Sequence, residues 1–98
     1  MGEKQRIYIV EDHTLLRAGL RSLLSQDPDI EIVGEADNGH DAIRAIGPLA
    51  PNLVLLDISM PGRGGLDVLK ELKSFYPKLP VLILSMHPEE QYAVRALR

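Results

Sequence analysis

The hydrophobic residues of this chain alternate between short apolar runs and longer stripes with helical spacing. Three runs have strand length and little polar alternation, a pattern typical of parallel strands covered on both faces. They occupy residues 7–10, 53–57 and 81–84. The segment 30–36 alternates more, which predicts a strand nearer the sheet edge. A helix is the competing interpretation for 53–57, but Pro51 and Pro61 bracket too few residues for one.

Apolar stripes at i, i+3 and i+4 predict a helix after each strand. The first begins near Leu15, has Asp12 and Thr14 as candidate N-caps, and ends at Asp27-Pro28. A short second helix spans 42–46 and ends at Gly47-Pro48 or at Ala50-Pro51. The third follows the glycine-rich loop 62–65, and the fourth starts with the acidic turn 88–90 and runs to Arg98.

Alternating strands and helices predict a doubly wound α/β domain with a parallel sheet. In the flavodoxin-like order the first strand lies beside the third, so the sheet order is 2-1-3-4. Ligands of such sheets bind outside the carboxyl ends of the strands, where Glu11, Asp12, Asp57 and Ser85 would meet.

Three carboxylates in one cleft repel each other, since two unit charges 4 Å apart cost about 4 kcal/mol at an effective dielectric of 20. A raised carboxyl pKa is one solution, and a hard divalent cation is the other. Mg²⁺ takes oxygen ligands and recruits phosphate oxygens, so the arrangement favours phosphoryl chemistry. Asp57 would then be the nucleophile, and Ser85 would hydrogen-bond the phosphoryl oxygen.

Four short motifs stand at the strand ends: Ile9-Val10-Glu11-Asp12, Leu56-Asp57-Ile58-Ser59-Met60-Pro61, Gly65-Leu66 and Leu84-Ser85. Together they closely resemble the receiver domain of two-component response regulators, over residues 7–98. The segments 15–20 and 85–87, with Tyr92 and Ala96-Leu97, resemble the NarL/FixJ (LuxR-type) branch.

The resemblance implies a CheY-like fold and a set of roles. Asp57 would be the phosphoacceptor, Asp12 a direct Mg²⁺ ligand, and Glu11 a ligand directly or through water. Ser59 would offer its backbone carbonyl to the metal, and Ser85 would be the switch hydroxyl. The phosphoryl donor would be a sensor histidine kinase and the output a DNA-binding helix-turn-helix, so the domain would be a phosphoacceptor rather than a turnover enzyme.

The chain departs from a complete receiver at its C-terminal end. A complete receiver adds a fifth strand and helix, with a lysine that pairs with the phosphoryl group. We therefore expect residues 1–98 to be an incomplete receiver, without the fifth βα unit and without a DNA-binding output domain. The usual loop acid is replaced by Gly64.

An incomplete sheet has a consequence for association. The strand 81–84 would lie at an open edge, and Ile7 and Ile9 would lose the helix that covers them. We therefore expect a homodimer or higher oligomer through the fourth-strand edge, by strand addition or by helix exchange.

Other functional classes fit less well. A phosphatase of the haloacid dehalogenase kind would need an aspartate where Ser59 stands. A flavodoxin-like cofactor binder would need a neutral phosphate loop where Glu11 and Asp12 repel anions. A degenerate receiver that acts only as a dimerisation or interaction module is the remaining alternative. His13 and His87 are left outside the site, because a hard-oxygen site does not need imidazoles.

Composition narrows the partners and the compartment. A net charge of -3 gives no basic face, so we expect no direct contact of this segment with nucleic acid. The chain has no cysteine and shows no signal peptide or membrane span, so we expect a cytoplasmic protein without disulfides or thiolate metal sites.

Overall fold

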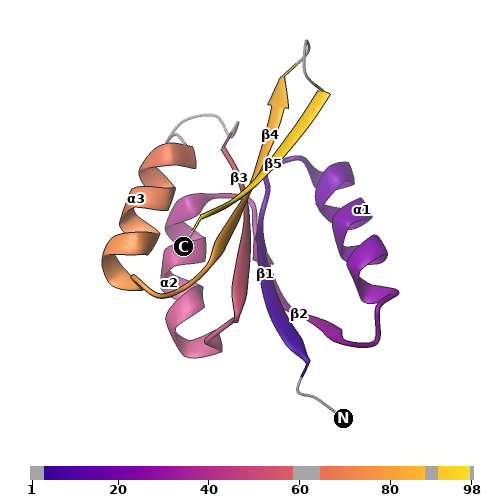
Figure 1. Ribbon diagram of the computed structural model, residues 1–98, viewed down its shortest axis with the longest axis horizontal. Helices are drawn as coiled ribbons and strands as arrows, with labels where there is room; N and C mark the ends of the chain where they lie inside the picture. The colour runs from indigo at the N-terminus through magenta and orange to yellow at the C-terminus, as the bar shows by residue number, and fades with distance from the viewer. Residues whose placement is uncertain (1–3, 59–64, 88–90, 98) are drawn as a thin grey trace.

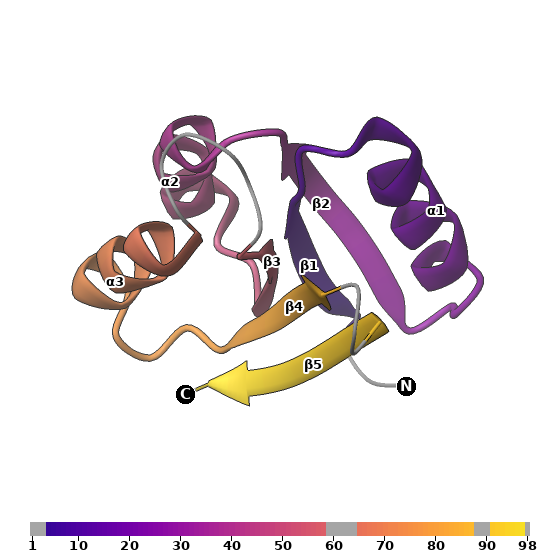
Figure 2. The same cartoon turned by 90° about the horizontal axis from the view of Figure 1, so that it is seen from above.

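A mainly parallel sheet runs through the centre of the molecule, with helices on both of its faces (Figures 1 and 2). The structure is a computed structural model that describes the backbone of residues 4–58, 65–87 and 91–97, and the side chains of residues 4–58 and 65–84. Within these ranges the strand order is β2-β1-β3-β4-β5. The expected doubly wound fold with order 2-1-3-4 is confirmed for the first four strands.

The helices and strands follow one another in the predicted alternation up to β4. The strands are β1 (Gln5–Val10), β2 (Ile30–Ala36), β3 (Leu53–Asp57), β4 (Val81–His87) and β5 (Gln91–Leu97). The helices are α1 (Thr14–Ser25), α2 (Gly39–Leu49) and α3 (Gly65–Phe75). None of the helices in the described part of the chain is long and apolar enough to cross a membrane.

Each face of the sheet has its own hydrophobic core. Figure 2 shows α2 and α3 on one side of the sheet and α1 on the other. The α2/α3 side holds the larger core, in which Tyr8, Val10 and Leu56 contact residues of both helices. On the α1 side, Ile7, Ile9 and Leu55 pack against Leu20 and Leu24. Burial on both faces explains why β1 and β3 are continuous apolar runs.

The helix ends differ in detail from the expected ones. The N-cap of α1 is His13, without a side-chain capping bond, so neither Asp12 nor Thr14 caps this helix. Asn38 caps α2 by accepting the Asp41 N–H, and the helix continues past Pro48 to Leu49. The later of the two predicted stops for this helix is therefore the correct one.

The predicted fourth helix is wrong. Residues 91–97 form β5, which runs antiparallel to β4 with Val81 opposite Leu97 and His87 opposite Gln91. Without a neighbour, β4 would leave a row of backbone N–H and C=O groups unsatisfied, and the hairpin pairs them. The apolar positions 92, 94 and 96 suit the two-residue period of a strand, so the local pattern does not oppose this pairing.

Two further expectations also fail. The fourth strand is not an open edge, because β5 pairs along its whole length, so the expected route to a dimer through that edge has lost its basis. Ile7 and Ile9 do not lose their cover either, since they are 4% and 0% exposed beneath α1. The first helix, α1, covers that face.

The β4–β5 hairpin predicts a distinctive hydrogen-exchange pattern. The carbonyl of Leu84 accepts the Ile58 N–H at 3.2 Å, so Leu84 faces β3 and its neighbours Ile83 and Ser85 face β5. We expect the amides of Ile83 and Ser85, which face carbonyls of β5, to be protected from exchange. Ala93→Pro should reduce that protection, because it deletes the N–H opposite Ser85 and places a ring between the two strands, which disrupts their pairing.

Ala93→Ser, which keeps the backbone N–H, is the matched control and should retain the protection. Rapid exchange of both amides in the unmodified chain would show that residues 91–97 do not pair with β4.

Candidate functional site

Glu11 and Asp57 are brought to the same edge of the sheet by strand register. Val10 pairs with Leu56 in the parallel ladder, so the residues that follow them emerge side by side. The Glu11 N–H donates to the Ala36 carbonyl of β2 at 3.0 Å, which ties the end of β1 to the next strand. The carboxyl ends of β1 and β3 thus form one acidic edge, as the sequence predicts.

The acidic side chains at this edge differ sharply in burial. Glu11 is 0% exposed and Asp57 is 1% exposed, although both carry carboxyl groups. The side chain of Asp12 is 22% exposed and lies at the mouth of the site. One ligand atom from each of Glu11, Asp12, His13 and Asp57 lies within 4.8 Å of all the others. The structure therefore brings together the three carboxylates that sequence reasoning singled out.

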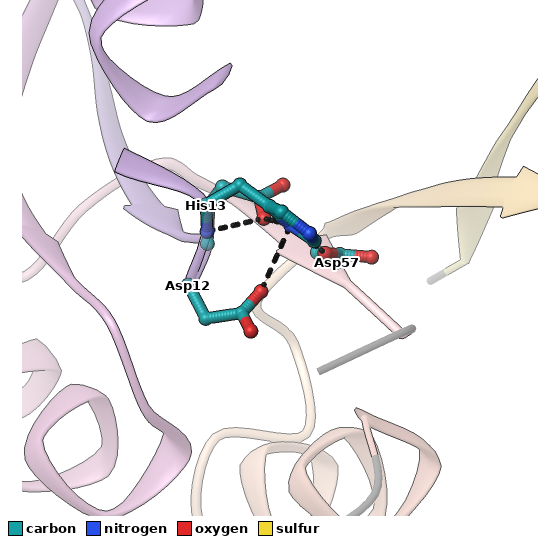
Figure 3. A group of neighbouring side chains, drawn as sticks. Asp12, His13 and Asp57 are labelled. Carbon is teal, nitrogen blue, oxygen red and sulfur yellow. Dashed lines mark hydrogen bonds and ion pairs between the residues drawn. The ribbon is translucent and has the colours of Figure 1, made fainter. Parts of the chain in front are cut away.

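His13 lies among these carboxylates (Figure 3). Its Nδ1 is 3.0 Å from Glu11 Oε2, 3.1 Å from Asp12 Oδ1 and 3.9 Å from Asp57 Oδ2. The His13 backbone N–H also donates to Glu11 Oε2, at 3.0 Å. Sequence reasoning left His13 outside the site. Its place directly after Glu11-Asp12, in the same strand-to-helix loop, is the signal that could have included it.

The pKa values of this group reflect burial and crowding. Burial, followed by the neighbouring Asp57 carboxyl, raises the pKa of Glu11 from 4.5 to about 7, although the hydrogen bonds from His13 act in the opposite direction. The hydrogen bond to Glu11, followed by the charge of Asp12, raises the pKa of His13 above its ordinary value of 6.5. Both shifts favour the protonated forms of Glu11 and His13, and protonation of either group would reduce the repulsion among the carboxylates.

The oxygen atoms of the site fit a hard cation. Glu11 Oε1 is buried and has no hydrogen-bond donor among the described residues, and Asp12 Oδ1 is buried with the His13 Nδ1 at 3.1 Å. A buried carboxylate oxygen without a donor carries a desolvation cost, which a bound cation would offset. Carboxylate oxygens are the ligands that Mg²⁺ and Ca²⁺ prefer.

Gly65 fixes how closely α3 approaches the end of β3. A Cβ atom at this position would lie 2.2 Å from Ile58 Cα and 2.9 Å from the Asp57 carbonyl oxygen. Only glycine permits this contact, because real Cβ atoms do not approach backbone so closely. The first residue of α3 therefore packs directly against the backbone of Asp57 and Ile58.

Two expected site residues cannot be placed by their side chains. Ser59 lies outside the described residues, and the side chain of Ser85 is not described. The backbone of Ser85 follows Leu84, which is the register partner of Asp57. The strand ladder therefore brings the Ser85 backbone to the same edge of the sheet as Asp57.

Comparison with known proteins gives a consistent result. The family model described as the response regulator receiver domain matches residues 7–98. The chain is 38% identical over 96 residues to the nitrate/nitrite response regulator protein NarL of Escherichia coli K12, covering 98% of this chain and 44% of NarL. It is 34% identical over 95 residues to the transcriptional regulatory protein DegU of Brevibacillus brevis, covering 97% of this chain and 40% of DegU.

Among solved structures, the fold is similar to the signal receiver domain of the response regulator NarL from Mycobacterium tuberculosis. The TM-score is 0.80 at 37% identity, with 91% of this chain and 72% of the other covered. The chain spans about two fifths of the length of the curated relatives it matches.

The raised pKa of Glu11 predicts a stability that falls with rising pH when no metal is present. From pH 4.5 to about 7 the folded chain keeps a proton on Glu11 that the unfolded chain releases, so rising pH favours unfolding. We expect the free energy of unfolding to fall by at most about 3 kcal/mol across this pH range, and we expect Glu11→Gln to reduce this pH dependence. The measurement is urea unfolding at a series of pH values with a chelator present.

His13 contributes a slope of the same sign at higher pH. Its raised pKa gives stability that is present below 6.5 and is lost as the pH passes the folded value. His13→Gln is the variant that separates the two contributions. A stability of the unmodified chain that increases between pH 4.5 and 7 would contradict the assignment to Glu11.

Proposed function

This chain belongs to the response regulator receiver domain family, and on that premise we propose that it is a phosphoacceptor switch of the NarL type. In this proposal Asp57 takes a phosphoryl group from a histidine kinase, with Mg²⁺ held at the acidic edge. The observation that carries it is the convergence of two fully buried carboxyl groups and Asp12 at the carboxyl ends of β1 and β3.

The residues that would hold Mg²⁺ are Glu11, Asp12 and Asp57, together with the backbone carbonyl of Ser59. The buried oxygen Glu11 Oε1, which meets no hydrogen-bond donor of the described residues, supports this assignment, because a bound cation would give it a partner. When bound, Mg²⁺ would neutralise charge on the phosphoryl group and on the surrounding carboxylates. We expect Glu11 to release its proton on metal binding, since a bound cation would favour the charged form that burial and the neighbouring Asp57 carboxyl disfavour.

The chemical step needs an ionised Asp57 carboxylate. One of its oxygens attacks the phosphorus of a phosphohistidine on the kinase, and a P–O bond forms as the P–N bond breaks. The kinase histidine is the leaving group, and its freed ring nitrogen takes up a proton from water. Burial of Asp57 strips water from the nucleophile and limits the geometry of approach. The product is an acyl phosphate on Asp57. The domain itself therefore keeps the phosphoryl group and does not act as an enzyme that turns over a substrate.

We propose that the switch is read through β4. The phosphoryl group would add charge and acceptor oxygens beside the Ser85 position, and the Ser85 hydroxyl would turn toward them. The relatives named above are transcriptional regulators, so we propose transcription as the output of the whole protein and a cytoplasmic sensor kinase system as its setting. The net charge of -3 supports an output that does not depend on DNA contact by this segment.

Mg²⁺ binding is the first test of this proposal. A Mg²⁺ titration should shift the amide resonances of residues 11–13 and 57. Asp12→Asn should weaken the affinity by about tenfold or more, because a lost carboxylate costs more than the roughly 1.4 kcal/mol behind a tenfold change.

Asp67→Asn removes an acidic residue from the exposed first turn of α3 and is the matched control, with unchanged affinity expected. No shift around Asp12 and Asp57 at millimolar Mg²⁺ would contradict the proposed metal site.

Phosphorylation is the second test. Incubation with acetyl phosphate and Mg²⁺ should add one base-labile phosphoryl group, seen by intact mass spectrometry. Asp57→Ala should abolish the adduct, whereas Asp67→Ala should not change it, because only Asp57 ends the central strand beside the metal ligands. An adduct that persists in Asp57→Ala would show that another carboxylate is the acceptor.

A further inference from the structure

Arg17 contacts both ends of the loop that carries the acidic residues. Its side-chain Nη1 donates to the carbonyl oxygen of Glu11 at 2.7 Å. Its backbone N–H donates to the carbonyl oxygen of His13 at 2.8 Å, in the first turn of α1. The three-residue loop from Glu11 to His13 is therefore bracketed by a single residue one turn into the helix.

The guanidinium of Arg17 is itself held from the other side by β2. Its Nε donates to Glu35 Oε1 at 2.9 Å, and Arg21 Nη1 donates to Glu35 Oε2 at 3.0 Å. The side chain of Arg17 is 19% exposed, while that of Arg21 is 55% exposed. Arg17 thus links α1, β2 and the Glu11–His13 loop, whereas among the described residues Arg21 reaches only Glu35.

We propose that Arg17 is a positioning residue for the metal site, and this inference rests on the proposed Mg²⁺-dependent function. By holding the Glu11 carbonyl, the guanidinium sets the direction in which the Glu11 and Asp12 side chains leave the backbone. Glu35 keeps the guanidinium in place, and the Glu11 N–H, which belongs to the preceding peptide unit, donates to the Ala36 carbonyl of β2. Outer partners that orient metal ligands commonly account for 10–100-fold in metal affinity.

Electrostatics alone predicts the opposite effect, and this makes the inference testable. A cation next to the acidic edge repels Mg²⁺, so removing Arg17 should tighten metal binding if its charge were its only relevant property. A loss of affinity on removing Arg17, with the urea midpoint unchanged, therefore indicates lost positioning. Arg21 offers the matched control, because it carries the same charge and contacts the same Glu35, without reaching the loop.

The experiment compares Arg17→Met with Arg21→Met in the full chain. For each we would measure Mg²⁺ affinity from the amide shifts of Asp12 and Asp57, the rate of phosphorylation by acetyl phosphate, and the urea midpoint. We expect Arg17→Met to bind Mg²⁺ about tenfold more weakly and to be phosphorylated correspondingly more slowly at subsaturating metal. At saturating Mg²⁺ its rate should recover toward that of the unmodified chain, and Arg21→Met should match the unmodified chain at every concentration.

Arg17→Lys and Arg21→Lys provide a second pair in case Arg17→Met does not fold. Lysine keeps the charge but lacks the planar fork that reaches Glu35 and the Glu11 carbonyl together. We expect Arg17→Lys to weaken Mg²⁺ binding and Arg21→Lys to leave it unchanged.

Equal Mg²⁺ affinities within both pairs would overturn the inference, because position 17 would then act through charge or overall stability alone. If the unmodified chain itself does not bind Mg²⁺, the proposed function fails. If the unmodified chain binds Mg²⁺ and the pairs do not differ, only the role of Arg17 fails.

Discussion

The structure depends on placing two carboxyl groups, Glu11 and Asp57, out of contact with water at the ends of adjacent parallel strands. Carboxyl groups are rarely buried so fully unless a partner or a proton offsets the cost. Here the offset comes from a raised pKa on Glu11 and from the imidazole of His13. A cation bound to these carboxylates would offset the cost of burying them more strongly than His13 does.

The two apolar cores keep the acidic ends of β1 and β3 in place. β1 and β3 are buried on both faces, so neither strand end can move away from its neighbour without exposing apolar side chains. Gly65 allows α3 to press on the backbone next to Asp57, and Arg17 holds the carbonyl of Glu11 from the α1 side. The backbone that carries Glu11 and Asp57 is thus contacted by both α1 and α3.

The C-terminal hairpin shows how an edge can decide secondary structure. The sequence 91–97 carries apolar residues at spacings that suit either a helical face or one face of a strand. Among the described residues β4 has a parallel neighbour, β3, on one side only, and the energetic cost of unpaired backbone groups on its other side favours the strand. The open edge is thereby moved to β5 rather than removed.

The sequence by itself determined the alternation of strands and helices up to β4, the sheet order and the three carboxylates, because apolar runs and strand-end acids are local patterns whose meaning follows from parallel-sheet geometry. Three features were decided only by the tertiary structure. His13 joined the acidic group because the loop folds back over Glu11, Arg17 reached the same loop because α1 lies against β2, and residues 91–97 became a strand because β4 needed a partner. The last two depend on contacts between segments that no local period encodes, whereas His13 lies two residues from Glu11 in the same loop.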